Sequence, residues 1–569
     1  QSLLCVMSKT FASILTSRLR ESIEVENKVC PEQAGFRTQH STIDHIYTLH
    51  AMILKHVYGN RRGKLYVTFI DYRKAFDSVN RSQLWEVLRR ARLSTKFLKM
   101  LQAMYHKVQS CVRWGQEFSD FFNCPSGVKQ GAVESPSIFS LYINAVADHV
   151  RRNGKHGVQM VPGMTELYLL LFADDVVLVS TTPVGLQNQL DSLQHMSKLL
   201  NLTINTGKTK VMVFRRGGHL SAGESWFLDG SRLETVNHYR YLGFIFTTKL
   251  SIDTSLDEIA TRGKQKGVQV LKALWNLRCM KTKVFTKLFD ALVQATLLYG
   301  AEIWGLGRQE KIERTHTFMC KRFMGIDTRS PNHMVYGDLG RFPLTINSGL
   351  RTIKYWLKLC HMTAERLPKQ AFLMLQNSSI KSGRNWAESV KLCLCRLGFY
   401  YAWLNSGVGD DKRFLSLLKQ RLKDCCLQEW SAKNVSSDRY VWYSSFKQQC
   451  GLEEYLNLID IKKFRDVLIR FRFGINDLNN NKRYIGVIDT NCPWCKEREN
   501  EQHFLMRCPV YKHLRKRYLT HYLSKTSEEF ACKQLMQCKS NAMTRSLAMY
   551  IFYAFRLREQ KLKEENNVE

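Results

Sequence analysis

Two short apolar runs with an aspartate pair between them are the feature that most limits what this chain can fold into. Residues 168–172 and 176–180 are rich in β-favouring side chains, and Asp174 and Asp175 stand between them. The pattern predicts a β-hairpin with both acids at its bend. Aspartate also favours turns for purely structural reasons. The flanks are strongly apolar, however, and no cation is adjacent in sequence, so a bound metal ion would relieve the repulsion between the two charges.

A second predicted strand, residues 64–70, ends at Asp71. If this strand lies beside the hairpin, three carboxylates meet at one edge of a sheet. Joining a nucleotide to a 3′-hydroxyl is an in-line displacement at phosphorus that two divalent metal ions assist. Magnesium prefers oxygen ligands and keeps several waters, so a few carboxylates on rigid elements suffice. The three acids therefore predict a site for two Mg²⁺ ions.

The charge of the chain restricts its partners. Lysine and arginine number 85 against 50 acidic residues, which gives a net charge of +35 over 569 residues. Such an excess favours a polyanion, either a nucleic acid or an acidic membrane surface. No apolar run reaches the roughly 18 residues of a spanning helix, and we expect no membrane partner. The 17 cysteines are scattered and odd in number, which favours a reducing compartment over a disulfide scaffold.

The order of these motifs resembles the reverse transcriptases of non-LTR (LINE-type) retrotransposons. Phe172-Ala173-Asp174-Asp175 is similar to their F/YxDD motif, and residues 69–77, which contain Asp71, are similar to their first carboxylate motif. The resemblance covers about residues 1–305. Further stretches resemble the QxGF motif, the template-and-nucleotide loop, the lysine-bearing motif and the primer-grip hairpin: residues 33–37, 126–131, 205–210 and 241–243.

The resemblance implies an α/β right-hand polymerase. We expect fingers and a palm with an antiparallel sheet in 1–250, a helical thumb in 251–330, a helical connecting region in 331–480 and a zinc-knuckle nucleic-acid-binding region in 481–569. The implied activity is RNA-directed DNA polymerisation, which extends a DNA 3′ end on an RNA template at a nicked target. The implied partners are an RNA template, a DNA primer or target, and dNTPs. The implied location is the nucleus, with a cytoplasmic ribonucleoprotein stage.

Particular residues take roles from the same resemblance. Asp71 and Asp174 would bind both Mg²⁺ ions, with Asp175 as the third acid. Phe76 would lie under the sugar and select dNTPs, although a core phenylalanine is the structural alternative. The remaining candidates for the nucleotide, the template or the phosphates are Gln130, Gly131, Lys208 (with Lys210 as its competitor) and Arg37. Each of these could instead belong to an ordinary polar loop or a solvated face.

Two departures from the family pattern keep other functions open. Ala132-Val133-Glu134 replaces the usual residues of the template-and-nucleotide loop, and the chain starts at Gln1 where the family's lead-in ends. We therefore expect a fragment that begins inside the fingers. The main alternative is a decayed or repurposed nucleic-acid-binding protein without polymerase activity. A group II intron maturase-like protein is a third possibility, against which the FADD form and the downstream cysteines count.

A cysteine–histidine cluster lies near the C-terminus. Cys492, Cys495, His503 and Cys508 follow the spacing C-x2-C-x7-H-x4-C. Three thiolates and one imidazole suit a closed tetrahedral zinc site, which is structural because no position stays open. Unbound thiols with a surface histidine are the alternative. The cluster resembles the zinc knuckle of non-LTR elements, and the basic residues around it would suit RNA or target DNA: Arg498, Arg507, Lys512, Arg515, Lys516 and Arg517.

Overall fold

The computed structural model describes residues 5–59, 63–221, 223–378, 380, 385–435, 440–482, 489–523 and 527–566. The lead-in residues 1–4 lie outside this part. The chain forms two compact units, Gln1–Ser255 with Ile353–Val408, and Leu256–Thr352 with Gly409–Glu569. The expected connecting region 331–480 is therefore divided between both units. No helix among the described residues is long and apolar enough to cross a bilayer.

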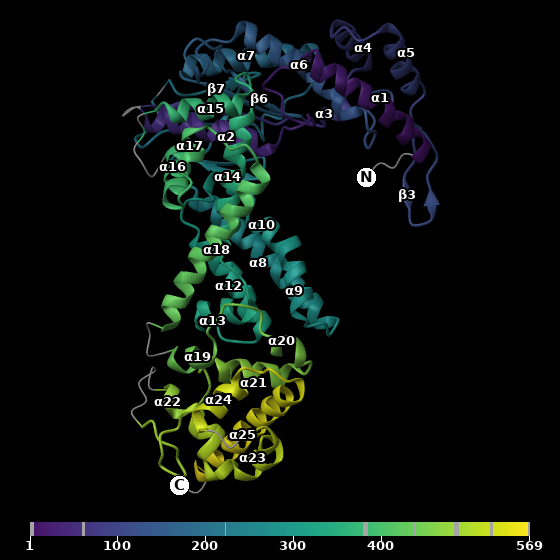
Figure 1. Ribbon diagram of the computed structural model, residues 1–569. Coiled ribbons are helices and arrows are strands. Elements are labelled where there is room, and N and C mark those ends of the chain that lie inside the picture. The colour runs from purple at the N-terminus through teal and green to yellow at the C-terminus, as the bar shows by residue number, and fades with distance from the viewer. Residues whose placement is uncertain are drawn as a thin grey trace. The chain divides into compact units, whose positions relative to one another are not determined.

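A five-stranded sheet with the order β11-β8-β1-β7-β6 forms the centre of the first unit (Figure 1). Strand β1 (Leu65–Ile70) is buried throughout and runs antiparallel to β7 (Asp175–Ser180) and to β8 (Lys210–Phe214). Strand β6 (Leu169–Phe172) pairs with β7 as the predicted hairpin, and β11 (Glu234–Thr235) runs parallel to β8. The predicted mixed α/β content is thus confirmed for this unit, and all strand pairs of its sheet except β11–β8 are antiparallel.

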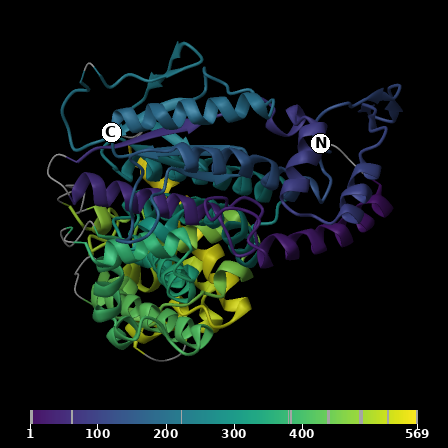
Figure 2. The same ribbon diagram turned by 90° about the horizontal axis from the view of Figure 1, so that it is seen from above.

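Helices α6 (Ser135–Asn153) and α7 (Pro183–Leu199) lie side by side and cover one face of the sheet (Figure 1, Figure 2). Alternate strand residues such as Ile70, Val176 and Val211 point into this shared core. On the opposite face, Phe69 stacks on Tyr239 with ring centroids 4.1 Å apart. Because the sheet is buried on both faces, the position of its strand ends is fixed.

The other helices of this unit are α1 (Val6–Val25), α2 (Thr42–Ile53) with its π-helical end η1 (Leu54–Tyr58), α3 (Ala75–Ser78), α4 (Arg81–Arg90) and α5 (Thr95–Met104). Its small strand pairs are β2 (Gln109–Ser110) with β5 (Phe122–Asn123), β3 (Arg113–Trp114) with β4 (Glu117–Phe118), β9 (Phe227–Leu228) with β10 (Ser231–Arg232), and β12 (His238–Tyr241) with β13 (Phe244–Thr247).

A late segment of the chain returns to this unit. It contains the second half of α14 (Thr345–His361), then α15 (Leu367–Gln376), α16 (Trp386–Arg396) and α17 (Tyr400–Leu404), and α15 packs on α2. Asp44, which is buried in α2, accepts hydrogen bonds from the Tyr355 hydroxyl at 3.1 Å and the Lys358 ammonium at 3.0 Å. Breaking a buried ion pair is costly, so this contact anchors the segment.

The second unit is helical. Its N-terminal helices are α8 (Asp253–Asn276), α9 (Thr282–Leu288), η2 (Phe289–Gln294), α10 (Ala295–Leu297), α11 (Ala301–Trp304), α12 (Glu310–Met324) and α13 (Asn332–Leu339). Its later helices are α18 (Asp411–Val435), α19 (Val441–Phe446), α20 (Tyr455–Leu458), α21 (Lys462–Arg472), α22 (Asn479–Lys482), η5 (His503–Arg507), η6 (Pro509–Tyr511), α23 (Lys512–Tyr518), η7 (Thr520–Tyr522), α24 (Glu528–Met536) and α25 (Asn541–Asn566).

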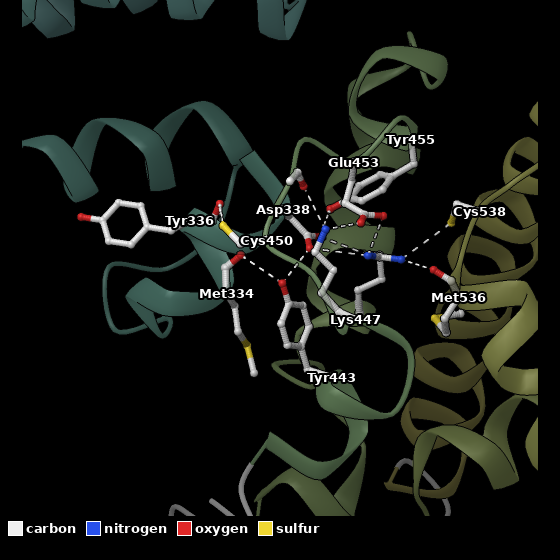
Figure 3. A network of polar contacts seen from close by, with 12 residues as sticks. Met334, Tyr336, Asp338, Tyr443, Lys447, Cys450, Glu453, Tyr455, Met536 and Cys538 are labelled. Carbon is white, nitrogen blue, oxygen red and sulfur yellow. Dashed lines mark hydrogen bonds and ion pairs between the residues drawn. The ribbon is translucent and has the colours of Figure 1, made fainter. Parts of the chain in front are cut away.

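A buried ion pair organises the core of this second unit (Figure 3). Arg472 and Asp338 are 1% and 0% exposed, and the arginine Nε donates to the carboxylate at 3.2 Å. The hydroxyls of Tyr443 and Tyr455 donate to the same carboxylate at 2.8 and 2.7 Å. The guanidinium also donates to the carbonyl of Met536. The network therefore links α13, α19, α20, α21 and α24 through charges that are fully paired.

Candidate active site

Strand register brings the acids to one edge of the sheet. Ile70 pairs with Val176 across β1 and β7, so the next pair in this antiparallel register sets Asp71 opposite Asp175. Phe172 pairs with Asp175 across the hairpin, which leaves Ala173 and Asp174 as its two-residue turn. Asp71 and Asp174 are half-buried. The bend of the hairpin and the end of β1 thus meet as the sequence predicted.

The segment around Gln33 holds the acidic turn in place. Ala173 has a φ of +58°, a left-handed conformation that needs support in a residue other than glycine. The Gln33 Oε1 accepts hydrogen bonds from the backbone N–H groups of Ala173 at 3.1 Å and Gly35 at 2.7 Å, and its Nε2 donates to the Ala173 carbonyl at 3.4 Å. A Cβ on Gly35 would lie 2.3 Å from the Ala173 nitrogen. Only glycine allows this approach.

The pKa values of Asp174 and Asp175 are raised. Asp175 is exposed on its outer side, and partial desolvation of its carboxylate, followed by the charges of Asp174 and Asp71, raises its pKa to about 6. Burial also raises the pKa of Asp174, and the charge of Asp71 adds to this rise. A backbone hydrogen bond partly offsets it. No ion pair among the described residues involves any of the three acids. Negative charge is therefore concentrated here, and no ion pair with a described residue neutralises it.

The Asp71 carboxylate is positioned by the motif that follows α7. The Asn205 Nδ2 donates to Asp71 Oδ2 at 3.0 Å, and the Asn205 backbone N–H donates to the Asp71 carbonyl at 2.7 Å. The same turn carries Lys208, whose backbone N–H donates to the Asn205 carbonyl at 3.1 Å. The sequence motif indicated only the lysines of this stretch, and it gave no sign that the Asn205 side chain would bind the Asp71 carboxylate.

An open pocket of about 630 Å³ adjoins Asp71. Its lining includes the cationic side chains of Arg73, Lys74 and Lys208 together with the carboxylates of Asp71 and Asp77. The competing lysine, Lys210, donates to Glu234 at 2.6 Å instead. A pocket with one acidic edge and a basic rim suits a metal-bound phosphate chain.

The other nucleotide candidates have mixed surroundings. Phe76 is half-buried and stacks on Phe139 with centroids 4.2 Å apart, so part of its ring serves the core. Gln130 is exposed, and its Nε2 donates to Asp77 Oδ1 at 2.8 Å. Gly131 is exposed with a φ of +81°, a conformation that favours glycine. The carboxylate of Asp77 thus anchors the loop.

Arg37 differs from the expectation. Its guanidinium forms two hydrogen bonds to Glu24, at 3.1 and 2.7 Å, and a third to the Cys30 carbonyl at 3.1 Å. With these contacts Arg37 stabilises the base of the QxGF segment, and a phosphate would compete with Glu24 for its guanidinium. Glu134, the departure noted in the sequence, is buried, and its carboxylate has no hydrogen-bond partner among the described residues.

The cysteine–histidine residues converge in the second unit. The ligand atoms of Cys492, Cys495, His503 and Cys508 all lie within 4.8 Å of one another. The His503 Nε2 lies 3.3 Å from the Cys495 sulfur, while its Nδ1 lies 3.2 Å from a carboxylate oxygen of Glu497. A carboxylate on the ring nitrogen that does not bind the metal, as Glu497 is on Nδ1, orients a histidine for metal binding. The four donors fit a tetrahedral Zn²⁺ site.

The aspartates are more widely spaced than this group. Among the described residues, one group of three or more His, Cys, Asp or Glu side chains has all its ligand atoms within 4.8 Å of one another, and this group is the cysteine–histidine set. The three carboxylates nevertheless supply the oxygen donors and uncompensated charge that Mg²⁺ requires, and waters can complete its coordination. Their chemistry fits the ions that the sequence predicts.

Comparison with known proteins agrees with this geometry. Residues 1–246 match the family model described as reverse transcriptase (RNA-dependent DNA polymerase). The chain is 25% identical over 337 residues to the RNA-directed DNA polymerase from mobile element jockey of Drosophila funebris, covering 56% of this chain and 34% of that protein. It is 24% identical over 371 residues to the Pol polyprotein of the type-2 retrotransposable element R2DM of Drosophila melanogaster, covering 64% and 33%.

The first 246 residues are therefore a reverse transcriptase domain. Both of these relatives are proteins of mobile genetic elements, and the chain is similar to them over more than half of its length. It spans only about a third of the length of these two relatives. Among solved structures, apo telomerase from Candida tropicalis aligns with 72% of this chain and 61% of its own at 13% identity, with a TM-score of 0.33.

Proposed function

We propose that this chain is the polymerase part of a non-LTR retrotransposon protein that extends a DNA 3′ end on an RNA template, with priming at nicked target DNA. The observation that carries the proposal is the register that sets Asp71 opposite Asp175 beside a pocket with a basic rim. The motif order in residues 1–246 supports the same activity. We also propose that the chain divides as a right-hand polymerase does, with fingers and palm in 1–250, a thumb in 251–330, a connecting region in 331–480 and a C-terminal region in 481–569.

In this proposal Asp71, Asp174 and Asp175 hold two Mg²⁺ ions. When bound, these ions would activate the attacking oxygen and neutralise the charge of the leaving group. Lys208 binds the triphosphate from the opposite side of the pocket. Phe76 supports the sugar with the part of its ring that Phe139 leaves free, and the Gln130–Asp77 hydrogen bond sets the loop that contacts the template.

The C-terminal region has a supporting role. Cys492, Cys495, His503 and Cys508 would hold a structural Zn²⁺ ion that fixes a small nucleic-acid-binding module. Lys512, Lys516 and Arg517 are the basic residues best suited to bind RNA or target DNA, because Arg498, Arg507 and Arg515 donate to protein oxygens. We also propose that the protein acts in the nucleus, after a stage as a ribonucleoprotein in the cytoplasm.

Primer extension tests the activity. An oligo(dT) primer on poly(rA) is incubated with the chain, dTTP and Mg²⁺, beside Asp174→Ala and Asp77→Ala proteins. The wild-type chain should extend the primer, Asp174→Ala should lose extension, and Asp77→Ala should retain a reduced rate. Extension that survives in Asp174→Ala would refute the metal assignment.

A second candidate is a nucleic-acid-binding protein without polymerase activity. The buried, unpartnered carboxylate of Glu134 at the template loop favours it, because an unpaired buried charge destabilises the loop. Absence of extension by wild-type protein that still binds primer–template would support this candidate. Restoration of extension by Glu134→Leu would identify that residue as the cause.

A further inference from the structure

A pocket of about 430 Å³ in the second unit has no role in the proposed chemistry. It is formed by the end of α8, the C-terminal end of α12 with its following turn, and one face of α21. All of these residues belong to the unit Leu256–Thr352 with Gly409–Glu569. Its lining includes Trp275, Arg322, Asp327, Lys462 and Arg470.

A close approach of two helices creates this pocket. Gly325 ends α12 with a φ of +71°, and its N–H donates to the Arg322 carbonyl. A Cβ on Gly325 would lie 2.5 Å from a carboxylate oxygen of Asp466 on α21. Arg470 on α21 donates to the Gly325 carbonyl at 3.4 Å. These contacts cap the negative end of α12, which would otherwise disfavour an anion in the pocket.

Positive charge dominates the lining. Three cationic side chains face the single carboxylate of Asp327, which already accepts from the backbone and the guanidinium of Arg329 at 2.8 and 3.0 Å. Lys462 is paired with Asp466. Arg322 and Arg470 have no carboxylate within ion-pair distance in the described part of the chain. The guanidinium of Arg322 and the donors of Arg470 that do not bind the Gly325 carbonyl therefore remain for an anion, and their planar fork suits the oxygens of a phosphate.

An exposed tryptophan completes the pocket. Trp275 is 44% exposed, although a ring of this size is normally buried. An aromatic face beside arginine and lysine is the combination by which proteins hold unpaired nucleotides, with the base on the ring and the phosphate on the cations. In a duplex the base faces are covered by stacking, so the ring would have no partner there.

We propose that this pocket binds one nucleotide of a single-stranded nucleic acid, with the base stacked on Trp275 and the phosphate between Arg322 and Arg470. The volume suits a ligand of that size. This binding requires neither metal nor dNTP and shares no residue with the pocket at Asp71. It is therefore a further nucleic-acid site, separate from the polymerase chemistry and from the basic residues that follow the cysteine–histidine cluster.

Photo-cross-linking tests the site directly. Single-stranded oligonucleotides that contain 5-iodouracil, one series RNA and one DNA, are irradiated with the full chain without Mg²⁺ or dNTPs, and tryptic peptides are analysed by mass spectrometry. The adduct should appear on the peptide 273–278, which contains Trp275. Duplex of the same sequence should not compete. The relative yields of the two series show which sugar the site prefers.

Matched variants separate the site from general charge. Arg322→Ala combined with Arg470→Ala should lower the yield on peptide 273–278 about tenfold, since it removes both phosphate contacts. Lys412→Ala combined with Lys419→Ala removes the same charge from exposed positions on α18 and should leave the yield unchanged. Trp275→Ala should weaken binding at this site about 5- to 100-fold, whereas Trp275→Phe should retain most of it.

Two outcomes would overturn the proposal. One is an unchanged yield in the arginine variant, or an equal loss in the lysine control. The other is labelling that follows exposure alone, because Trp114, which is 84% exposed, would then be labelled more strongly than Trp275 and independently of the arginines. The Asp174→Ala protein should cross-link as the wild type does. A chain that cross-links but never extends a primer would refute the proposed polymerase activity and leave this site standing.

Discussion

Replacement of Gln33 by leucine should loosen the turn that carries Asp174. Leucine has a similar volume but no acceptor for the N–H groups of Ala173 and Gly35, which the glutamine Oε1 bonds at 3.1 and 2.7 Å. Gln33 is fully buried, so water cannot replace the lost partner without local opening. Each buried N–H left unsatisfied costs about 1–3 kcal/mol.

Hydrogen exchange gives a local measurement of this loss. Peptides that contain the Ala173 and Gly35 amides should exchange about 5- to 150-fold faster in Gln33→Leu, the range that corresponds to 1–3 kcal/mol. Primer extension should fall with them, because the carboxylate of Asp174 is no longer held in one orientation. Global melting reports this less directly, since two units unfold in one chain.

Gln189 provides a matched control. It is also fully buried, on α7, but neither of its amide atoms has a hydrogen-bond partner among the described residues. Gln189→Leu removes an unpaired polar group and should leave stability unchanged or raise it by about 1 kcal/mol. Equal exchange rates in wild-type and Gln33→Leu protein, or equal damage by both substitutions, would refute the argument.

Three further predictions follow from the same structure. Asp338→Asn should destabilise the second unit by about 1–3 kcal/mol in chemical denaturation, because it removes one of the two carboxylates that neutralise the buried Arg472 and leaves only Glu453, at 2.9 Å; a loss below about 1 kcal/mol would contradict this. The pKa of Asp175 is raised to about 6, so metal-free protein should lose stability as pH rises through that value, and Mg²⁺ or Asp175→Asn should remove the loss in thermal melts. Purified chain should carry one zinc that Cys495→Ser loses and Cys393→Ser keeps, measured by elemental analysis; equal zinc in both variants would remove the site.

The central strands of the first unit could be predicted from the sequence because their signals are local. The hairpin of residues 168–180 and the strand before Asp71 appear as β6, β7 and β1. The spacing of the cysteines and His503 likewise predicted a convergence that occurs. In these places turn chemistry and side-chain type determine the geometry over a few residues, so no distant partner has to be known.

The contacts that local sequence patterns did not reveal join residues that are far apart in the chain or that lie on different elements. A basic residue such as Arg37 signals a charge, but the sequence does not show that Glu24 lies beside it. The amphipathic pattern of α15 shows that one face is buried without showing that α2 covers it. The contact between Asp44 and Lys358 spans 314 residues, so the return of residues 353–408 to the first unit could not be predicted from a local pattern.

Cleavage by a bound iron ion tests most directly whether the aspartates share metal ions. Fe²⁺ in place of Mg²⁺, with peroxide and ascorbate, cuts backbone close to the bound ion, and the fragments are sized by mass spectrometry. We predict cuts in two distant segments, residues 69–73 and 172–176, which Mg²⁺ suppresses and Asp174→Ala abolishes together. Cuts in only one of these segments, or cuts that persist in both when Asp174 is replaced, would contradict a shared metal site.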